Sequence, residues 1–309
     1  MRRNENEALL YETLLTLTKK DEKKAWLLYG MVALKCDISR TLPEIIYPAG
    51  EATGFSSFEL SETYYRIRNA FSSYRFEMTI LKEGDPQWPT SLKNSGVHFL
   101  YMVGRTELLS KVKVAVRGFR VPTEKGKNAA ICAMRDIKDA DGAVITTADT
   151  GLDHYAAAYA LSEGIPVILV LSSPLHMAVP EAAKELLVSA ANGNGLLVSQ
   201  FPPHVKAEKW FAVPRNRLLL SLADHFVLCE EKDGGPLFAQ AETFLGEKGR
   251  VFVYESFISD PAYKYAGKLS QAEGTCILKK KGDLKKILVP QKKSSRRKKD
   301  EDQPGLFDL

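Results

Sequence analysis

The chain has 309 residues, of which 45% are hydrophobic and 26% charged, a composition typical of a globular protein with a sizeable core. No apolar run approaches the roughly 18 residues that a membrane-spanning helix needs, and the N-terminal segment lacks the apolar stretch of a secretory signal. The four scattered cysteines form no CxxC pair, and Cys132 and Cys229 lie in apolar segments. We therefore expect free thiols, no membrane contact and a cytoplasmic location.

The net charge of +5 is distributed unevenly along the chain. Residues 279–299 contain 11 Lys and Arg against one acid, whereas residues 300–309 contain four acids and no base. Residues 1–278 are thus left with a net charge of about −1. Any nucleic-acid surface on this nearly neutral part must be a local patch.

The first third of the chain has a helical pattern. Residues 5–34 predict two helices joined by a short charged link, and another helical stretch covers about residues 57–74. We predict a small helical N-terminal domain over residues 1–80. The segment Asp85-Pro-Gln-Trp-Pro then marks a boundary, because each proline disfavours helix at the residue before it.

Short apolar runs alternate with amphipathic helices from Lys111 onward. Strands are expected at 112–116, 143–147, 167–171, 196–198, 225–229 and 250–254. Helices are expected at 124–137, 153–163, 181–191, 216–222 and 237–245. This alternation predicts βαβ crossovers and hence an α/β, Rossmann-like doubly wound parallel sheet over residues 81–289. Ligands of such sheets bind beyond the carboxyl ends of the strands, so functional residues are expected in the loops there.

A glycine turn follows the first of these strands. The segment Gly118-Phe-Arg120-Val-Pro-Thr123-Glu-Lys-Gly126 runs from strand to helix and would direct backbone N–H groups at one spot, which suits a phosphate. Arg120 would add a guanidinium. The alternative is that Gly118 only makes a tight turn and that Arg120 is solvated. The chain has neither a GxGxxG fingerprint nor a Walker A motif, which argues against NAD or ATP, and we expect no cofactor.

A second cluster lies at the start of an apolar helix. Arg215 and Arg217 flank Asn216 there, and together they could clamp a phosphate backbone while Asn216 caps the helix or touches a base. The alternative is an ordinary helix start whose arginines face water.

Taken in order, these segments resemble the DNA-processing protein A (DprA/Smf) family over roughly residues 80–278. Its D-P-x-Y-P-x-x-L entry corresponds to 85–92, its G-S-R…T/S…G loop to 118–126, and its F-x-x-R-N-R-I-I-x-x-L-S segment to 211–222. The resemblance implies single-stranded DNA binding, action as a homodimer and delivery of RecA recombinase, in transformation or recombination.

Several positions depart from the family motifs. The loop S-G-L-A-x-G-I-D-x-x-A-H corresponds to residues 146–157, where Gly151 and Asp153 are retained. The first glycine is replaced by Thr147 and the histidine by Ala157. Larger side chains at these positions can fill the space that the small residues of the family motif leave open for a ligand. The resemblance therefore does not imply which ligand this loop binds. We therefore expect a divergent member of the family.

We predict a DprA-like protein that binds and protects single-stranded DNA and assists RecA loading, and that is not an enzyme. The sequence pattern contains no triad or carboxylate pair, and the five histidines show no metal-ligand spacing. One alternative is a nucleotide-binding Rossmann-like protein, although Gly234-Gly235-Pro236 lacks the Gly-Thr that follows in nucleoside-monophosphate phosphoribohydrolases. Another is an adaptor that acts through its tail.

Residues 290–309 have little to bury and are predicted to be a disordered tail. Its basic part could hold DNA by counterion release or simply be solvated; these residues are Lys292, Lys293, Arg296, Arg297, Lys298 and Lys299. Its end resembles the Q-x-x-L-F peptide by which bacterial proteins dock on the replication sliding clamp. Gln303, Leu306 and Phe307 would make that contact.

Overall fold

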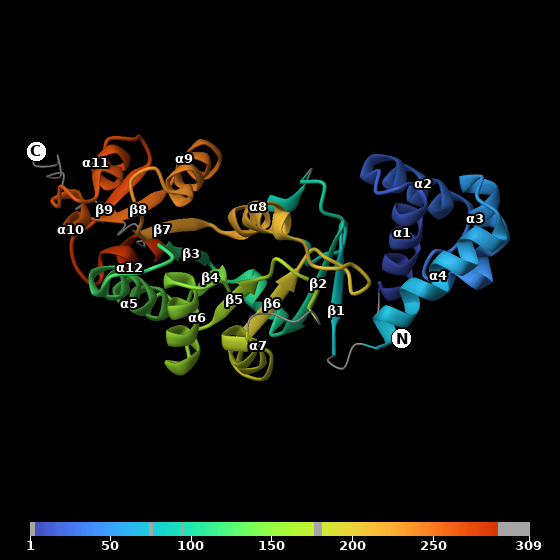
Figure 1. Cartoon of the computed structure of the whole chain (residues 1–309), viewed down its shortest axis with the longest axis horizontal. Helices are drawn as coiled ribbons and strands as arrows, with labels where there is room; N and C mark the ends of the chain where they lie inside the picture. The colour runs from blue at the N-terminus through green and yellow to red at the C-terminus, as the bar shows by residue number, and fades with distance from the viewer. Residues whose placement is uncertain (1–3, 74–76, 94, 176–180, 290–309) are drawn as a thin grey trace, which may run out of the picture.

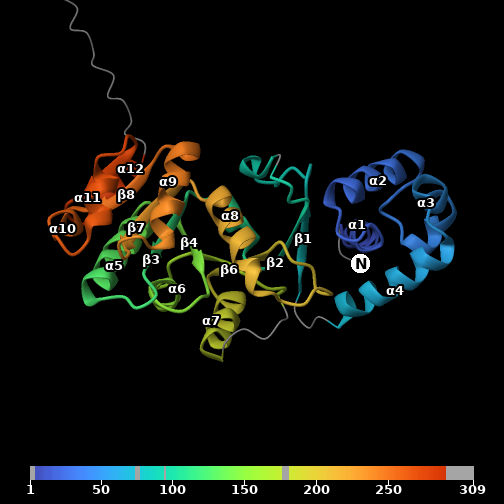
Figure 2. The same ribbon diagram turned by 45° about the horizontal axis from the view of Figure 1, so that its top comes forward.

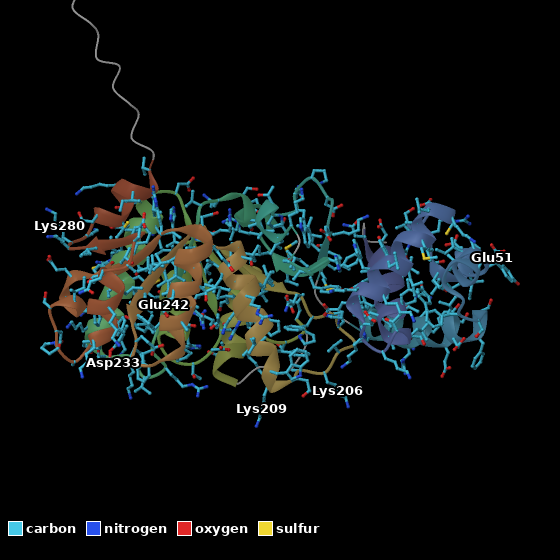
Figure 3. All side chains as sticks on the ribbon, turned by 90° about the horizontal axis from the view of Figure 1, so that it is seen from above. Glu51, Lys206, Lys209, Asp233, Glu242 and Lys280 are labelled. Carbon is cyan, nitrogen blue, oxygen red and sulfur yellow. The ribbon has the colours of Figure 1, made fainter. Side chains whose placement is uncertain are left out.

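Helices come first along the chain, and a nine-stranded sheet follows them (Figure 1). The computed structural model describes residues 4–73, 77–93, 95–175 and 181–289. The helical part occupies one end of an elongated molecule (Figure 1). Figure 3 shows the length of this arrangement, with Glu51 of the helical part at one end and Lys280 at the other.

The N-terminal helices pack around α1, whose residues Leu9, Leu10 and Leu14 are fully buried. Their ends are set by local capping: the Asp21 carboxylate accepts the Lys24 N–H at 3.0 Å, and Ser56 and Glu59 form a capping box. The helices are α1 (Glu5–Leu17), α2 (Glu22–Lys35), α3 (Ile46–Thr53), preceded by a 3-10 turn at Leu42–Ile45, and α4 (Ser57–Ser72).

The sheet has the strand order β1-β2-β6-β5-β4-β3-β7-β8-β9. All neighbouring strands pair parallel along the part of the sheet that runs β6-β5-β4-β3-β7-β8-β9. At the other edge, β1 pairs antiparallel with β2, and β2 pairs antiparallel with β6. The strands are β1 (Thr79–Lys82), β2 (Phe99–Gly104), β3 (Lys113–Gly118), β4 (Ala143–Thr147), β5 (Val167–Val170), β6 (Gly195–Ser199), β7 (His225–Glu230), β8 (Val251–Tyr254) and β9 (Thr275–Leu278).

Helices cover both faces of the parallel strands, so these strands are buried almost throughout (Figure 2). One face carries α5 (Glu124–Asp139), α6 (Leu152–Ser162), α7 (Glu181–Asn192) and α12 (Asp283–Leu288). The other face carries α8 (Ala212–Leu222), α9 (Pro236–Lys248) and α11 (Lys264–Ser270), and the short α10 (Glu255–Ile258) follows β8.

Aromatic side chains join the helical part to the edge of the sheet. The Trp26 ring of α2 stacks on His98 with ring centroids 3.8 Å apart, and Tyr11 of α1 packs on Phe99 of β2. Beneath them the Tyr101 hydroxyl of β2 donates to the buried carboxyl of Glu12 at 3.0 Å. The two parts therefore share one buried junction.

The predicted fold class, a doubly wound parallel sheet preceded by helices, is confirmed. All six expected strands and all five expected helices of the sheet region are present, most within one or two residues of their predicted ends. The antiparallel β1 and β2 and the last strand, β9, were not among the predicted strands. The division at residue 80 stays a prediction, and the tail lies outside the described residues.

Replacing Glu12 with glutamine is expected to flatten the dependence of stability on pH. Burial raises the pKa of Glu12 to about 8, so the folded state keeps a proton that the unfolded chain releases near its ordinary pKa. This contribution to stability is fully present below about pH 4.5 and is lost as the pH rises through 8. Urea unfolding at pH 5, 7 and 9 should show that the free energy of unfolding falls less between pH 5 and pH 9 in Glu12→Gln than in wild type. The difference is expected to be on the order of a few kcal/mol.

Glu62→Gln, which changes an exposed carboxylate of α4, is the matched control and should follow the wild-type profile. Parallel pH profiles for wild type and Glu12→Gln would contradict the buried, protonated carboxyl.

Candidate functional site

The centre of the sheet contains a topological switch point. Strands β3 and β7 lie side by side, but β4, β5 and β6 continue the sheet on one side and β8 and β9 on the other. Loops that leave the carboxyl ends at such a point diverge and expose a crevice to ligands. The pairing of β3 with β7 shifts register after Arg117 and sets Gly118 opposite Glu230. Candidate functional residues therefore lie around these two strand ends.

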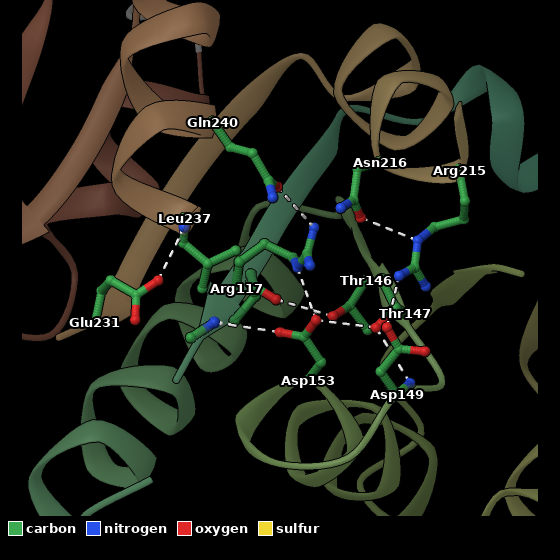
Figure 4. Close-up of polar contacts among 12 residues, drawn as sticks. Arg117, Thr146, Thr147, Asp149, Asp153, Arg215, Asn216, Glu231, Leu237 and Gln240 are labelled. Carbon is green, nitrogen blue, oxygen red and sulfur yellow. Dashed lines mark hydrogen bonds and ion pairs between the residues drawn. The ribbon is translucent and has the colours of Figure 1, made fainter. Parts of the chain in front are cut away.

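A buried carboxylate, Asp153 in the first turn of α6, ties the strand ends together (Figure 4). Its Oδ2 accepts from Arg117 Nε at 2.8 Å and from Thr147 Oγ1 at 2.9 Å. Its Oδ1 accepts the backbone N–H of Gly118 at 3.2 Å. Arg117 also donates from Nη1 to Gln240 Oε1 of α9 at 3.3 Å. This network fills the space beneath the strand ends and satisfies its own buried polar groups.

The N-terminus of α5 is occupied by a second carboxylate of the protein. Thr123 caps the helix by accepting the Gly126 N–H at 3.2 Å, and its own N–H donates to Glu230 Oε2 at 2.9 Å. Tyr263 donates to the other Glu230 oxygen at 3.1 Å. A Cβ on Gly126 would collide with the Glu230 carboxylate, so this close approach requires glycine. Glu230 thus lies where a helix N-terminus favours an anion.

These contacts change the interpretation of the first predicted phosphate site. The backbone N–H groups of Gly118, Thr123 and Gly126 all donate to acceptors within the protein. The Arg120 side chain is exposed and remains available to a ligand. Of the groups predicted to bind a phosphate in this loop, the Arg120 side chain is therefore the one left open to a ligand.

The second predicted site, at the start of α8, is divided between two environments. The Arg215 side chain is 2% exposed, and its Nη2 donates to Asp149 Oδ2 at 2.5 Å. Its Nε donates to Asn216 Oδ1 at 3.0 Å. Arg217 is exposed, because residues two apart on a helix point in different directions. The helix begins at Ala212, so Asn216 does not cap it.

The loop between β4 and α6, residues 148–151, brings the two predicted sites to one edge of the sheet. Gly151 packs so closely on the Arg120 backbone that a Cβ there would collide with it, and the backbone φ of Gly151 is +93°. Asp149 of the same loop holds Arg215. Two arginine segments that lie far apart in the sequence therefore contact the same short loop.

Three residues of this region were missed by sequence reasoning. Arg117, an arginine inside an apolar strand immediately before a glycine turn, could have been noticed as a buried charge in need of a partner. Lys232 lies over the Phe119 ring, with Nζ 4.5 Å from its centroid. Trp210 is 60% exposed although the adjacent Phe211 is buried and stacks on Phe201. No pattern in the sequence distinguishes an exposed tryptophan from a buried one.

Within the described ranges no three His, Cys, Asp or Glu side chains group as metal ligands, and no helix has the length and apolarity to cross a bilayer. All four cysteines are free; Cys229 is buried as expected, whereas Cys132 is only half-buried. The tail residues predicted to bind DNA and the sliding clamp, 292–299 and 303–307, lie outside the described residues.

Comparison with known proteins places this arrangement in a family. Residues 79–287 match the family described as DNA recombination-mediator protein A. The chain belongs to this family. The DNA processing protein DprA of Bacillus subtilis (strain 168) is 24% identical over 213 residues, which cover 68% of this chain and 70% of that protein.

Two solved structures of family members have the same fold. The DNA processing protein A structure from Streptococcus pneumoniae has a TM-score of 0.62 and 23% identity, covering 83% of this chain and 92% of that one. The Helicobacter pylori structure, titled for its single-stranded DNA binding mode, has a TM-score of 0.57 and 21% identity, covering 69% and 95%. The predicted membership in the DprA family is therefore confirmed.

The departures from the family loop motif are now explained by contacts. Thr147, in place of glycine, donates to Asp153 and accepts the Asp149 N–H at 3.2 Å. Asp149, in place of alanine, pairs with Arg215. The larger side chains fill and cross-link this part of the site.

Asp153→Asn is expected to destabilise the fold by about 3–5 kcal/mol, because it leaves the Arg117 guanidinium buried without a charged partner. Urea unfolding would measure the change. The double variant Arg117→Met with Asp153→Asn should recover a large part of the loss, since no unpaired buried charge remains. Asp139→Asn on the surface of α5 is the control. Equal losses in the single and double variants would contradict the ion-pair explanation.

Proposed function

We propose that this protein is a cytoplasmic, non-catalytic mediator that binds and protects single-stranded DNA and assists the loading of RecA recombinase. The observation that carries the proposal is the convergence of the Arg120 and Arg215–Arg217 segments on the loop 148–151 at the carboxyl edge of the sheet. Membership of the recombination-mediator family and the single-stranded DNA binding named for the Helicobacter pylori relative support it.

Because residues 1–278 are nearly neutral overall, phosphate contacts on this part would have to come from a few exposed cations. Arg120 and Lys232, which follow the ends of β3 and β7, are exposed, and so is Arg217 of α8. Lys206 and Lys209, in the segment before α8, are also exposed and project from one side of the molecule (Figure 3). These side chains could follow a phosphate backbone and release counterions on binding.

Other lysines near the site are already engaged. Lys125 pairs with Asp260 at 2.7 Å and lies over the rings of Phe257 and Tyr263. Its hydrogen bond to Asp260 lowers the pKa of that carboxyl. Lys127 pairs with Glu124 at 2.6 Å. These contacts neutralise part of the positive charge at α5, so we assign the phosphate contacts to Arg120 and Arg217.

Trp210 offers a platform for base stacking next to Arg217. Trp210, Val213 and Arg217 are all exposed, and their i, i+3, i+7 spacing places them along one side of α8 and the turn before it. An exposed ring followed by an arginine is the combination by which single strands are held without sequence preference. This stripe supports a single strand over a duplex, whose bases are already stacked on each other.

The RecA-loading part of the proposal rests on the family, whose description names recombination mediators. We further propose that the protein acts as a homodimer, which sedimentation equilibrium would test against a monomer of 34.4 kDa.

The double variant Arg120→Ala with Arg217→Ala is expected to lose single-stranded DNA affinity by on the order of tenfold or more at low salt. Each lost phosphate contact should lower the magnitude of the slope of log K against log salt by about 0.7. Fluorescence anisotropy with a labelled oligo-dT, titrated at several salt concentrations, measures both quantities. RecA filament assembly on the same oligonucleotide should lose its stimulation in parallel.

A control with the same change in charge is Lys23→Ala with Lys24→Ala on α2, at the other end of the molecule (Figure 1). It should bind as wild type does. If the arginine variant binds with unchanged affinity and salt slope, the assignment of this edge to DNA is wrong.

Trp210→Ala is expected to weaken oligo-dT binding by about 1–3 kcal/mol, the contribution of one stacked base, with little change in the salt slope. Trp210→Phe should retain part of this contribution. Phe58→Ala, which removes an exposed ring from α4, is the control. A loss that appears only as a change in salt slope would contradict stacking at Trp210.

A further inference from the structure

The contact between Asp149 and Arg215 has an unusual geometry for a buried ion pair. The Arg215 side chain is 2% exposed, whereas the Asp149 side chain is 49% exposed. One partner therefore belongs to the interior and the other is open to water. The position of the carboxylate, directly above a buried cation, can be reached from solvent.

The guanidinium is only partly satisfied in this arrangement. Nη2 donates to a single oxygen of Asp149 and Nε donates to Asn216, while Nη1 is buried with no hydrogen-bond partner among the described residues. A guanidinium is best satisfied by an anion that accepts from two of its nitrogens at once. Asp149 uses one oxygen, so a phosphate that bridged Nη1 and Nη2 would satisfy a donor that the protein leaves unpaired.

The loop that carries Asp149 also borders the proposed DNA contact. Gly151, two residues further on, packs against the backbone of the exposed Arg120. The Asp149 carboxylate therefore adds negative charge at the edge where a phosphate backbone would pass.

We infer that Asp149 is an internal anion that competes with a DNA phosphate for Arg215. The inference rests on the proposed function, since it assigns a regulatory position within the same DNA site. In the free protein Asp149 neutralises the buried guanidinium; on binding, a phosphate takes the carboxylate's place and Asp149 turns to solvent. Asp149 thereby lowers affinity for single strands and makes Arg215 available only to a competing anion.

Asp149→Asn tests the inference, because it removes the charge and keeps the size of the side chain. The variant is expected to bind oligo-dT about three- to tenfold more tightly, with a salt slope steeper by about 0.7, the value of one added phosphate contact. Asp149→Ala provides a second variant without a hydrogen-bonding group, and should also bind more tightly. Glu163→Gln, which removes one exposed carboxylate at the far end of α6, should leave affinity and slope unchanged.

A double-mutant cycle separates competition at Arg215 from a general change in charge. Arg215→Met keeps most of the side-chain volume, and in that background Asp149→Asn should give only the smaller gain that comes from removing one negative charge at this edge. An undiminished gain in the Arg215→Met background overturns the inference, as does wild-type or weaker binding by both Asp149 variants.

Sulfate distinguishes this inference from the proposed function. At equal ionic strength, sulfate should raise the melting temperature of Asp149→Asn more than that of wild type, because its anion site is vacated. If no variant binds oligo-dT but this difference is present, the proposed function fails and the competition stands. Equal shifts in wild type and variant overturn the competition.

Discussion

The arrangement of the site depends on the buried carboxylate of Asp153. It accepts hydrogen bonds from the side chain of Arg117, the backbone of Gly118 and the hydroxyl of Thr147, which belong to the ends of two neighbouring strands. Its place in the first turn of α6 adds the favourable field of a helix N-terminus. Because the loops with Arg120 and Asp149 begin at these strand ends, their positions follow from this one group.

Internal carboxylates take positions where the parallel fold usually receives a ligand. Glu230 lies at the N-terminus of α5, and Asp149 lies on the guanidinium of Arg215. A carboxylate that is part of the chain is held there without the loss of translational freedom that a bound anion would incur. Both positions are therefore occupied in the free protein, and the exposed side chains Arg120, Arg217 and Trp210 are the groups left open to a ligand there.

The sequence predicted the sheet region well because its parallel strands are short apolar runs separated by amphipathic helices. It could not predict β2 as a sheet member in the same way, since that strand pairs antiparallel with β6 and is not followed by a crossover helix. At the site, the two segments that motif order selected, around Arg120 and Arg215, both contact the loop 148–151. The division of Arg215 from Arg217, and the occupation of the backbone N–H groups by Asp153 and Glu230, depend on partners distant in the sequence.

Thr147 also constrains how the loop could have evolved. Its hydroxyl group donates to Asp153 and accepts the N–H of Asp149, so it supports both the interior network and the loop residue that holds Arg215. Replacing Thr147 alone with the glycine of the family motif would remove both contacts, whereas replacing Asp149 alone with alanine would leave Arg215 without its carboxylate. The effects of the two positions are therefore coupled, and substitutions here depend on the order in which they arise. A chain with glycine and alanine at these two positions would lack both hydrogen bonds and the carboxylate, so its loop would have to be held by other contacts.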